Sequence, residues 1–380
     1  MSALLRAMAP TARAVPVRDA LPADNAALVE LASACAMEGD IGICVDRAPD
    51  FFALTRLEGE RWRMGVVDSD DDSIAGCVLT AERHAWVRGV PSRMVYAGDL
   101  KVHPSHRGGA VADALVHYVR AAGRSLGGNQ APTWLTVLAG NVPMELRMRG
   151  PRGTPLLEPF ATFRAHSVPL LWERGAPAGG YQVTQAAERD IEEMASCWRR
   201  YAPTRQMAPV FDAASFADWV RRAPGLGIES YSLARDGAGR LAGFVGWWDQ
   251  RAFKQLRVTR YSRGQARFRT VFNAASPLTG ATPLPAAGGA LQQVSAIHLC
   301  VPGDNVAALR ALVLHGYRMH RGRGYSCLTL GLDVRDPLRR AVRGLLGQRT
   351  TIHALVSTPG GRYTGPALDD RPLHPEPSLV

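Results

Sequence analysis

The chain has 380 residues, which is too long for one hydrophobic core of ordinary size and therefore predicts two domains. With 46% hydrophobic and 21% charged residues, the composition excludes a disordered or fibrous protein. The formal net charge is +11, but nearly all the basic residues are arginines interspersed with acidic residues, and this scatter argues against a nucleic-acid-binding surface.

The cysteines and the hydropathy pattern exclude two further classes of protein. The six cysteines form no CxxC pair and have no histidine at a spacing typical of zinc sites, so we expect reduced thiols and no bound metal. No apolar run approaches the roughly 20 residues that a membrane-spanning helix needs. Together these features indicate a cytoplasmic protein that does not act at a membrane, and they leave its oligomeric state open.

A stretch rich in glycine, proline and alanine, ERGAPAGG over residues 173–180, separates two patterned regions and is typical of a linker. We therefore predict domains over residues 14–172 and 181–357. The segment after Ser357 is rich in proline and weakly patterned, so residues 358–380 are predicted to form a flexible tail.

In the first domain, apolar runs predict strands, and apolar residues at helical spacing predict helices. A strand and an amphipathic helix open the domain, three strands form an antiparallel meander, and a helix and a further strand follow. The predicted strands are residues 15–20, 63–67, 74–85, 92–102 and 134–139, and the predicted helices are residues 22–35 and 111–122.

The second domain repeats this order of elements around a poorly patterned segment between residues 262 and 293. The fold class is therefore α/β (α+β), with two similar domains that each contain a mixed, mostly antiparallel sheet flanked by helices. The predicted strands are residues 181–186, 229–235, 240–248, 255–261, 294–301, 326–332 and 351–357, and the predicted helices are residues 191–201 and 305–314.

The segment from Asp99 to Leu115, DLKVHPSHRGGAVADAL, combines a strand, a tight turn and a helix that begins with small residues. The first backbone N–H groups of a helix have no partner within the helix, and the helix dipole makes this end positive. Small residues let an anion approach these groups closely. The segment therefore predicts an anion site that could hold a pyrophosphate.

This segment resembles motif A of the GNAT N-acyltransferases, in which an aliphatic strand runs into the pattern R/QxxGxG/A. The resemblance implies that acetyl-CoA is the co-substrate, while a structural glycine-rich turn is the alternative. The chain departs from the pattern at Ala110, where glycine is usual. The implied cofactor-binding residues are Leu100, Lys101 and Val102 in the strand, Arg107, Gly108, Gly109 and Ala110 in the loop, and Val111 and Ala112 in the helix.

Other segments of the first domain extend the resemblance. Asn141 stands where GNAT proteins carry an asparagine near the pantetheine arm of CoA, and it also fits as a helix N-cap. The segments CVDRAPDFF (44–52), DLKV (99–102) and WDQRAFKQ (248–255) look like those of some bacterial tandem GNAT proteins. The last of them is either a hairpin held by side-chain hydrogen bonds or a wall of the acceptor site.

In the second domain, DNVAALRALVLHGY (304–317) resembles the GNAT helix pattern NxxAxxxYxxxGF, with Leu312 in place of its tyrosine. The strand 255–261 is followed by the bulky sequence RGQARFRT (263–270) and not by RxxGxG/A. We therefore predict that this domain binds no CoA and is structural or binds the acceptor. A second catalytic domain is the alternative.

Acyl transfer to an amine needs a group that takes a proton from the amine. Asp99 is the first candidate, because burial in an apolar strand would raise its pKa, and an ion pair with Lys101 or an arginine of a neighbouring strand is the alternative. Glu38 is the second candidate for this base, because in the GNAT fold its loop region lines the acceptor side. The alternative is that Glu38 is an exposed loop carboxylate without a role in catalysis. Because no tyrosine follows Asn141 at the usual spacing, Tyr96 or water would protonate the leaving thiolate.

The resemblance thus implies an N-acyltransferase that moves an acetyl group from acetyl-CoA to an amine of a small molecule or a peptide. Direct attack in a ternary complex depends mainly on positioning. A non-enzymatic acyl-CoA-binding or regulatory protein on the same fold is the alternative, and both Ala110 and the missing tyrosine favour it. Neither a metal nor a nucleic-acid partner is implied.

Overall fold

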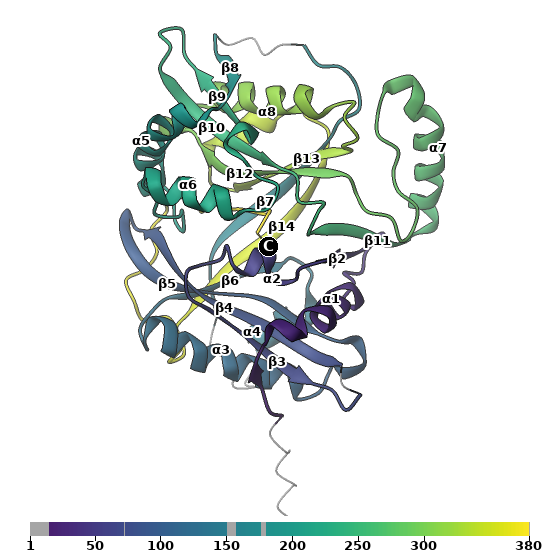
Figure 1. Cartoon of the computed structure of the whole chain (residues 1–380), viewed down its shortest axis with the longest axis vertical. Helices are drawn as coiled ribbons and strands as arrows, with labels where there is room; N and C mark the ends of the chain where they lie inside the picture. The colour runs from purple at the N-terminus through teal and green to yellow at the C-terminus, as the bar shows by residue number, and fades with distance from the viewer. Residues whose placement is uncertain (1–14, 72, 150–156, 176–179, 380) are drawn as a thin grey trace, which may run out of the picture.

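The computed structural model describes residues 15–71, 73–149, 157–175 and 180–379. The predicted α/β fold class is confirmed, because one large and mostly antiparallel sheet carries helices on its faces (Figure 1). Residue 14 and residues 176–179 of the predicted linker lie outside the described residues, and the predicted domain boundaries stay a prediction.

Residues 15–175, here called the first half, contain the predicted meander as β3 to β5. Leu28, Leu31 and Ala32 of the first helix are buried, as the helical spacing predicted. The strands are β1 (Arg18–Asp19), β2 (Ile41–Asp46), β3 (Trp62–Asp68), β4 (Ile74–Val87), β5 (Val90–Val102), β6 (Thr133–Leu138) and β7 (Glu158–Pro169). The helices are α1 (Asn25–Ala34), α2 (Phe52–Thr55), α3 (Val111–Gly127) and α4 (Val142–Arg149).

Residues 180–379, the second half, contain two helices that sequence patterning missed, α6 and α7. In α7 only Ser276 is buried, so this helix has no apolar stripe from which it could be predicted. The strands are β8 (Gln182–Gln185), β9 (Tyr231–Arg235), β10 (Leu241–Trp248), β11 (Gln255–Tyr261), β12 (Gln293–Cys300), β13 (Cys327–Asp333) and β14 (Gln348–Ser357). The helices are α5 (Ile191–Tyr201), α6 (Ala213–Arg222), α7 (Arg263–Thr279) and α8 (Val306–His320).

The two halves share one sheet because they exchange strands. The strand order is β1-β3-β4-β5-β6-β14-β7-β13-β12-β10-β9-β8. β14 of the second half lies between β6 and β7 of the first half and pairs antiparallel with both, while β7 pairs antiparallel with β13 (Figure 1). Only the pairs β5–β6 and β12–β13 are parallel in the described sheet. From either edge the sheet therefore repeats the same plan, so β12 and α8 occupy the place of β5 and α3.

A second connection between the halves is the two-stranded ribbon of β2 and β11, which pair antiparallel outside the main sheet. The neighbouring helix α7 stands at the side of the molecule, beyond this ribbon (Figure 1). The predicted strand 255–261 thus exists as β11, but it does not belong to the main sheet as the prediction implied.

Residues 372–379 correct part of the prediction of a flexible tail over residues 358–380, of which residue 380 lies outside the described residues. Leu373 is only 1% exposed, and its backbone N–H donates a hydrogen bond to the buried carboxylate of Asp333. On either side of it, the N–H of Gln206 donates to the carbonyl of Pro372, and the N–H of His374 donates to the carbonyl of Gln206. Residues 372–379 therefore pack as an extended strap inside the molecule.

Candidate functional site

β5 carries a bulge just before the predicted cofactor-binding residues. The register between β4 and β5 shifts so that Val78 faces two residues, Asp99 and Leu100. Asp99 has a φ of 50°, in the left-handed region that few residues other than glycine adopt. Gly98 beside it is required, because a Cβ there would lie 2.7 Å from the ring of Tyr96. The bulge redirects the end of β5 away from the line of its first part.

β5 and β6 remain neighbours for only a short distance. Their parallel pairing consists of Val95 with Thr133 and Tyr96 with Trp134. Beyond this point the strands part, and no other described strand pairs with the open side of β5 over residues 97–102. The backbone N–H and C=O groups along this edge can therefore bind an extended ligand in the way that an added strand is bound.

The chain then enters α3 through the predicted loop. Residues 107–110 are exposed, Gly108 has a φ of 81°, and a Cβ at Gly108 would meet no atom within 4 Å. Ala110 is the N-cap residue, and its side chain makes no capping hydrogen bond. The start of α3 thus lacks an N-cap side chain and lies next to open space, and both features favour the binding of an anion.

The predicted rise in the pKa of Asp99 is wrong. Its carboxylate lies 2.5 Å from Lys101 Nζ and 3.1 Å from Nη1 of Arg47, which follows β2. Burial alone would raise the pKa of Asp99, but the two positive charges outweigh burial and hold this pKa well below its usual range. The ion pair with Lys101, which was the alternative interpretation, is therefore present, and Asp99 is a weak base at neutral pH.

The three segments that resembled bacterial tandem GNAT proteins meet at this point. Arg47 comes from residues 44–52, Asp99 and Lys101 come from residues 99–102, and Lys254 comes from residues 248–255. Burial and the charges of Arg47 and Lys101 lower the pKa of Lys254 to about 7, although Asp99 opposes this shift. Sequence reasoning marked all three segments but assigned no role to Arg47 or Lys254.

The C-terminal strap reaches the same region. Lys254 Nζ and Gln250 Nε2 both donate hydrogen bonds to the carbonyl oxygen of Ser378, at 3.0 Å and 2.9 Å. The WDQRAFKQ segment is thus held by side-chain hydrogen bonds, and its role as a wall of the acceptor site stays a prediction. The strap also lines a cavity of about 20 Å³ through Glu376 and Leu379, next to Tyr96. A proline-rich sequence gave no signal for this placement.

Tyr96 lies where β5 and β6 part. Its ring is buried, packs 5.1 Å from the ring of Trp134 and has the guanidinium of Arg83 4.2 Å from its centre. Burial raises the pKa of Tyr96, and the charge of Arg83 opposes this rise. The hydroxyl therefore stays protonated at neutral pH, as a proton donor must, and its role in protonating a thiolate stays a prediction.

Glu38 and Asn141 lie in exposed loops. The Glu38 carboxylate is 69% exposed and forms an ion pair with Arg260 of β11 at 2.7 Å, so it has the environment of the exposed loop carboxylate that was the alternative. Asn141 follows β6, and its side chain accepts a hydrogen bond from the N–H of Met144 at 3.3 Å. The N-cap interpretation is therefore confirmed, and contact with a pantetheine arm stays a prediction.

The second half contains a similar bulge, but the residue at its centre is a buried histidine and not a carboxylate. Between β10 and β12 the register shifts so that Val245 faces His298 and Leu299, and His298 has a φ of 51°. His298 is fully buried among aromatic rings, with Tyr231 Oη 2.7 Å from its Nδ1. Burial lowers the pKa of His298 to about 4, although Glu376 nearby favours protonation. The imidazole is therefore neutral at pH 7.

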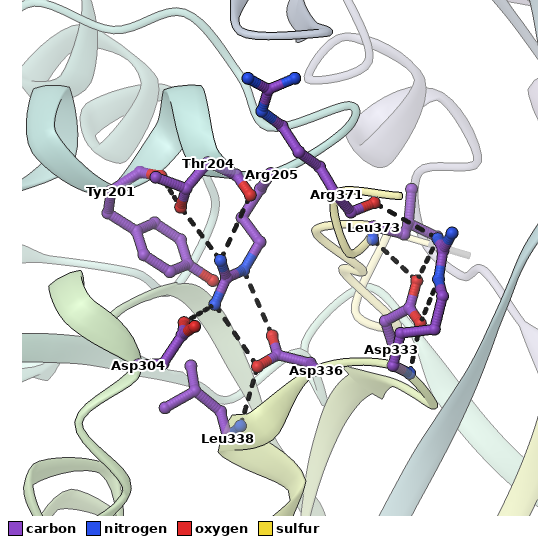
Figure 2. A network of polar contacts seen from close by, with 10 residues as sticks. Tyr201, Thr204, Arg205, Asp304, Asp333, Asp336, Leu338, Arg371 and Leu373 are labelled. Atoms are coloured by element: carbon purple, nitrogen blue, oxygen red, sulfur yellow. Dashed lines mark hydrogen bonds and ion pairs between the residues drawn. The ribbon is translucent and has the colours of Figure 1, made fainter. Parts of the chain in front are cut away.

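The loop after β12 is closed to an anion. The side chain of Asn305 accepts a hydrogen bond from the N–H of Ala308 and so caps the start of α8. Asp304 adds a negative charge there and pairs with the buried guanidinium of Arg205 at 2.5 Å. Figure 2 shows Arg205 between Asp304 and Asp336, whose carboxylate lies 3.2 Å from Arg205 Nε. This loop is thus part of a buried polar network.

The structure also corrects which segment of the second half corresponds to the loop before α3. The pattern DNVAALRALVLHGY was compared with the GNAT helix pattern NxxAxxxYxxxGF, and the small-residue loop was sought after the strand 255–261. In the structure α8 follows β12, whose place in the sheet is that of β5. The counterpart of the RxxGxG/A loop is therefore residues 301–305, and RGQARFRT belongs to α7. The expectation that the second half lacks the small-residue loop survives this change of position.

Solved structures provide the comparison with known proteins. The chain is similar to a GCN5-related N-acetyltransferase from Sphaerobacter thermophilus, with a TM-score of 0.55 and 16% identity, over 93% of this chain and 97% of that one. It is also similar to N-myristoyltransferase from Saccharomyces cerevisiae with bound myristoyl-CoA, with a TM-score of 0.61 and 11% identity, over 95% and 82% of the two chains. The chain has the GNAT fold. No protein family matches the sequence itself, and no curated protein does.

Over residues 15–71, 73–149, 157–175 and 180–379, no group of three or more His, Cys, Asp or Glu side chains could hold a metal ion. In the same residues, no helix is long and apolar enough to cross a bilayer.

Proposed function

We propose that this protein is an N-acyltransferase that moves an acetyl group from acetyl-CoA to an amine, and that CoA binds in the first half. The observation that carries the proposal is the open edge of β5 running directly into an uncapped helix start with small residues. An extended, amide-containing ligand with a pyrophosphate at its end fits this combination, and CoA has both parts.

The pyrophosphate would be held by backbone groups. Gly108 and Gly109 leave room for its oxygens, and the first N–H groups of α3 supply donors at the positive end of the helix dipole. The exposed guanidinium of Arg107 adds a positive charge beside them. Ala110 keeps its small side chain at the N-cap, so the departure from the GNAT pattern leaves this position uncrowded by a larger group.

The pantetheine arm would lie along residues 98–102. Its two amides can exchange hydrogen bonds with the free edge of β5, and the parting of β5 and β6 begins at Tyr96, where the thioester would then lie. The reacting carbonyl would then lie close to the Tyr96 hydroxyl and to Glu376 of the strap, and both of these residues line the same cavity.

The chemistry needs a neutral amine, a held thioester and a proton for the leaving thiolate. Attack of the amine nitrogen forms the C–N bond and breaks the C–S bond, and most of the acceleration comes from holding the two reactants in line. The nitrogen then loses a proton, which passes through water and restores the hydroxyl of Tyr96 after Tyr96 has protonated the thiolate. Tyr96 is protonated and can donate to the thiolate. Asp99 is held ionised by Lys101 and Arg47, so its proposed role changes from taking the amine proton to fixing these two cations.

The acceptor is an amine of a small molecule or a peptide. A second candidate function, acyl-CoA binding without turnover, is favoured by one observation. The carboxylate first expected to act as the base has a lowered pKa.

Turnover separates the two functions. The full chain is incubated with acetyl-CoA and a panel of small-molecule and peptide amines, thiol release is followed, and products are identified by mass spectrometry. We expect an acetylated amine and stoichiometric free CoA. CoA binding without any product across the panel, and with longer acyl chains as well, would favour the binding protein and contradict the enzyme.

A further inference from the structure

A basic cavity of about 120 Å³ lies on the face of the sheet that also carries the short 3-10 helix η7 (Pro337–Val342). Four arginines line it: Arg164 on β7, Arg349 on β14, Arg339 in η7 and Arg343 directly after η7. Arg349 and His166, which also lines the cavity, are directly opposite each other in the β7–β14 pair. The cavity therefore lies on the two strands that the halves exchange.

These positive charges are not neutralised by the protein. None of the four guanidinium groups forms an ion pair or a side-chain hydrogen bond with any described residue. The single carboxylate in the lining belongs to Asp333, and its two oxygens already accept hydrogen bonds from Arg335 and from the N–H of Leu373. All four arginines are exposed, so water and salt screen part of their mutual repulsion, and a bound polyanion would offset the rest.

The floor of the cavity shows the effect of this charge. His166, Leu332 and Val342 are buried there. Burial, together with the charges of Arg349 and Arg164, lowers the pKa of His166 to about 4. The site thus combines a partly apolar floor with a ring of guanidinium forks, whose planar donor pairs match the oxygens of phosphate groups.

We propose that this cavity binds a small anion with two or more phosphate groups, at a site separate from the CoA loop. Four arginines match the several negative charges of a di- or triphosphate better than the single charge of a monoanion. The volume holds the phosphate chain itself, so any nucleoside attached to it would remain outside. Because the ligand would contact both β7 and β14, binding would stabilise the pairing of these two exchanged strands and so raise the free energy of unfolding of both halves.

The test is thermal unfolding of the full chain with inorganic triphosphate while CoA is saturating, so that the α3 loop is occupied. We expect triphosphate to raise the Tm of the wild type. The double variant Arg164→Gln/Arg349→Gln should lose this rise, with affinity at least 10-fold lower. The matched control Arg340→Gln/Arg221→Gln removes two exposed arginines outside the lining and should keep it. If the double variant does not unfold cooperatively, Arg349→Gln alone takes its place.

A nucleoside triphosphate forms the second arm. Affinity equal to that of inorganic triphosphate identifies the phosphate chain as the whole ligand, and affinity at least 10-fold higher identifies a nucleotide; both results support the site. The proposal is overturned if triphosphate does not raise the Tm once CoA is saturating, because triphosphate then has no binding site apart from the CoA site. It is also overturned if the control loses the shift as fully as the double variant, because scattered arginines then suffice.

Discussion

The bulges at Asp99 and His298 are the same backbone device put to different uses. Each lies where a strand leaves its parallel neighbour. In each, two residues of the bulged strand lie opposite one residue of the antiparallel partner, and one of the two has a φ near 50°. Asp99 lies among cations beside an open strand edge. His298 lies in an aromatic cage, and its backbone N–H donates a hydrogen bond to the carboxylate of Glu376 in the C-terminal strap.

The loops that follow the two bulges explain why CoA binding is proposed for the first half alone. After Asp99 the loop is exposed and ends in an uncapped helix. After His298 the loop is shorter, its helix is capped by Asn305, and Asp304 is tied to Arg205 (Figure 2). A strand arrangement that is present twice therefore has one helix start that is open to an anion, because such a site depends on which groups remain without a partner and not on the strand order.

Asp99→Asn tests the first bulge through both stability and turnover. Asparagine tolerates the positive φ, but it leaves Arg47 and Lys101 facing each other without their shared carboxylate. Removing one partner of a buried ion pair costs about 3 kcal/mol, and the partial exposure of this site reduces the cost to roughly 2 kcal/mol in urea unfolding.

The same variant decides the role of Asp99 in the chemistry. Because the pKa of Asp99 is already far below neutrality, we expect the acidic limb of the pH–rate profile to remain in Asp99→Asn at reduced kcat. Loss of that limb would show that Asp99 takes the proton after all, and would reverse the role assigned here.

His298→Asn tests the second bulge through pH. The pKa of His298 is about 4 in the folded chain and near 6.5 when unfolded, so between these values the unfolded state binds the extra proton. The free energy of unfolding therefore falls as pH drops from 6.5 to 4, by roughly 3 kcal/mol from this group alone.

In His298→Asn the fall in the free energy of unfolding between pH 7 and pH 4 should be smaller by about that amount, as measured by urea unfolding at each pH. If the free energies of unfolding of the wild type and the variant fall equally with pH, His298 is not held neutral by the surrounding aromatic rings.

The sequence predicted what depends on local pattern and missed what depends on distant contacts. The loop 107–110, α3 and the meander follow from small residues and apolar spacing along one segment. The prediction for Asp99 was wrong because the charges of Lys101, two residues along the strand, and of Arg47, 52 residues away in the chain, together lower its pKa. Arg47 reaches the site only after β2 folds back. The burial of Leu373 and Ser378 could not be predicted, because a proline-rich extended strap has no periodicity and is held by the partners Asp333 and Lys254.

The central claim is that CoA binds once per chain, at the start of α3. Calorimetric titration with CoA of the wild type, Ala112→Glu and Ala307→Glu tests it directly. Each alanine is the second residue of its helix, α3 or α8, and Ala307 is exposed, so the glutamate is tolerated there. In α3 the new carboxylate would repel the pyrophosphate and occupy its space. We predict a stoichiometry near one for the wild type and for Ala307→Glu, and affinity at least 100-fold weaker for Ala112→Glu. A stoichiometry near two, or undiminished binding by Ala112→Glu, would contradict the account.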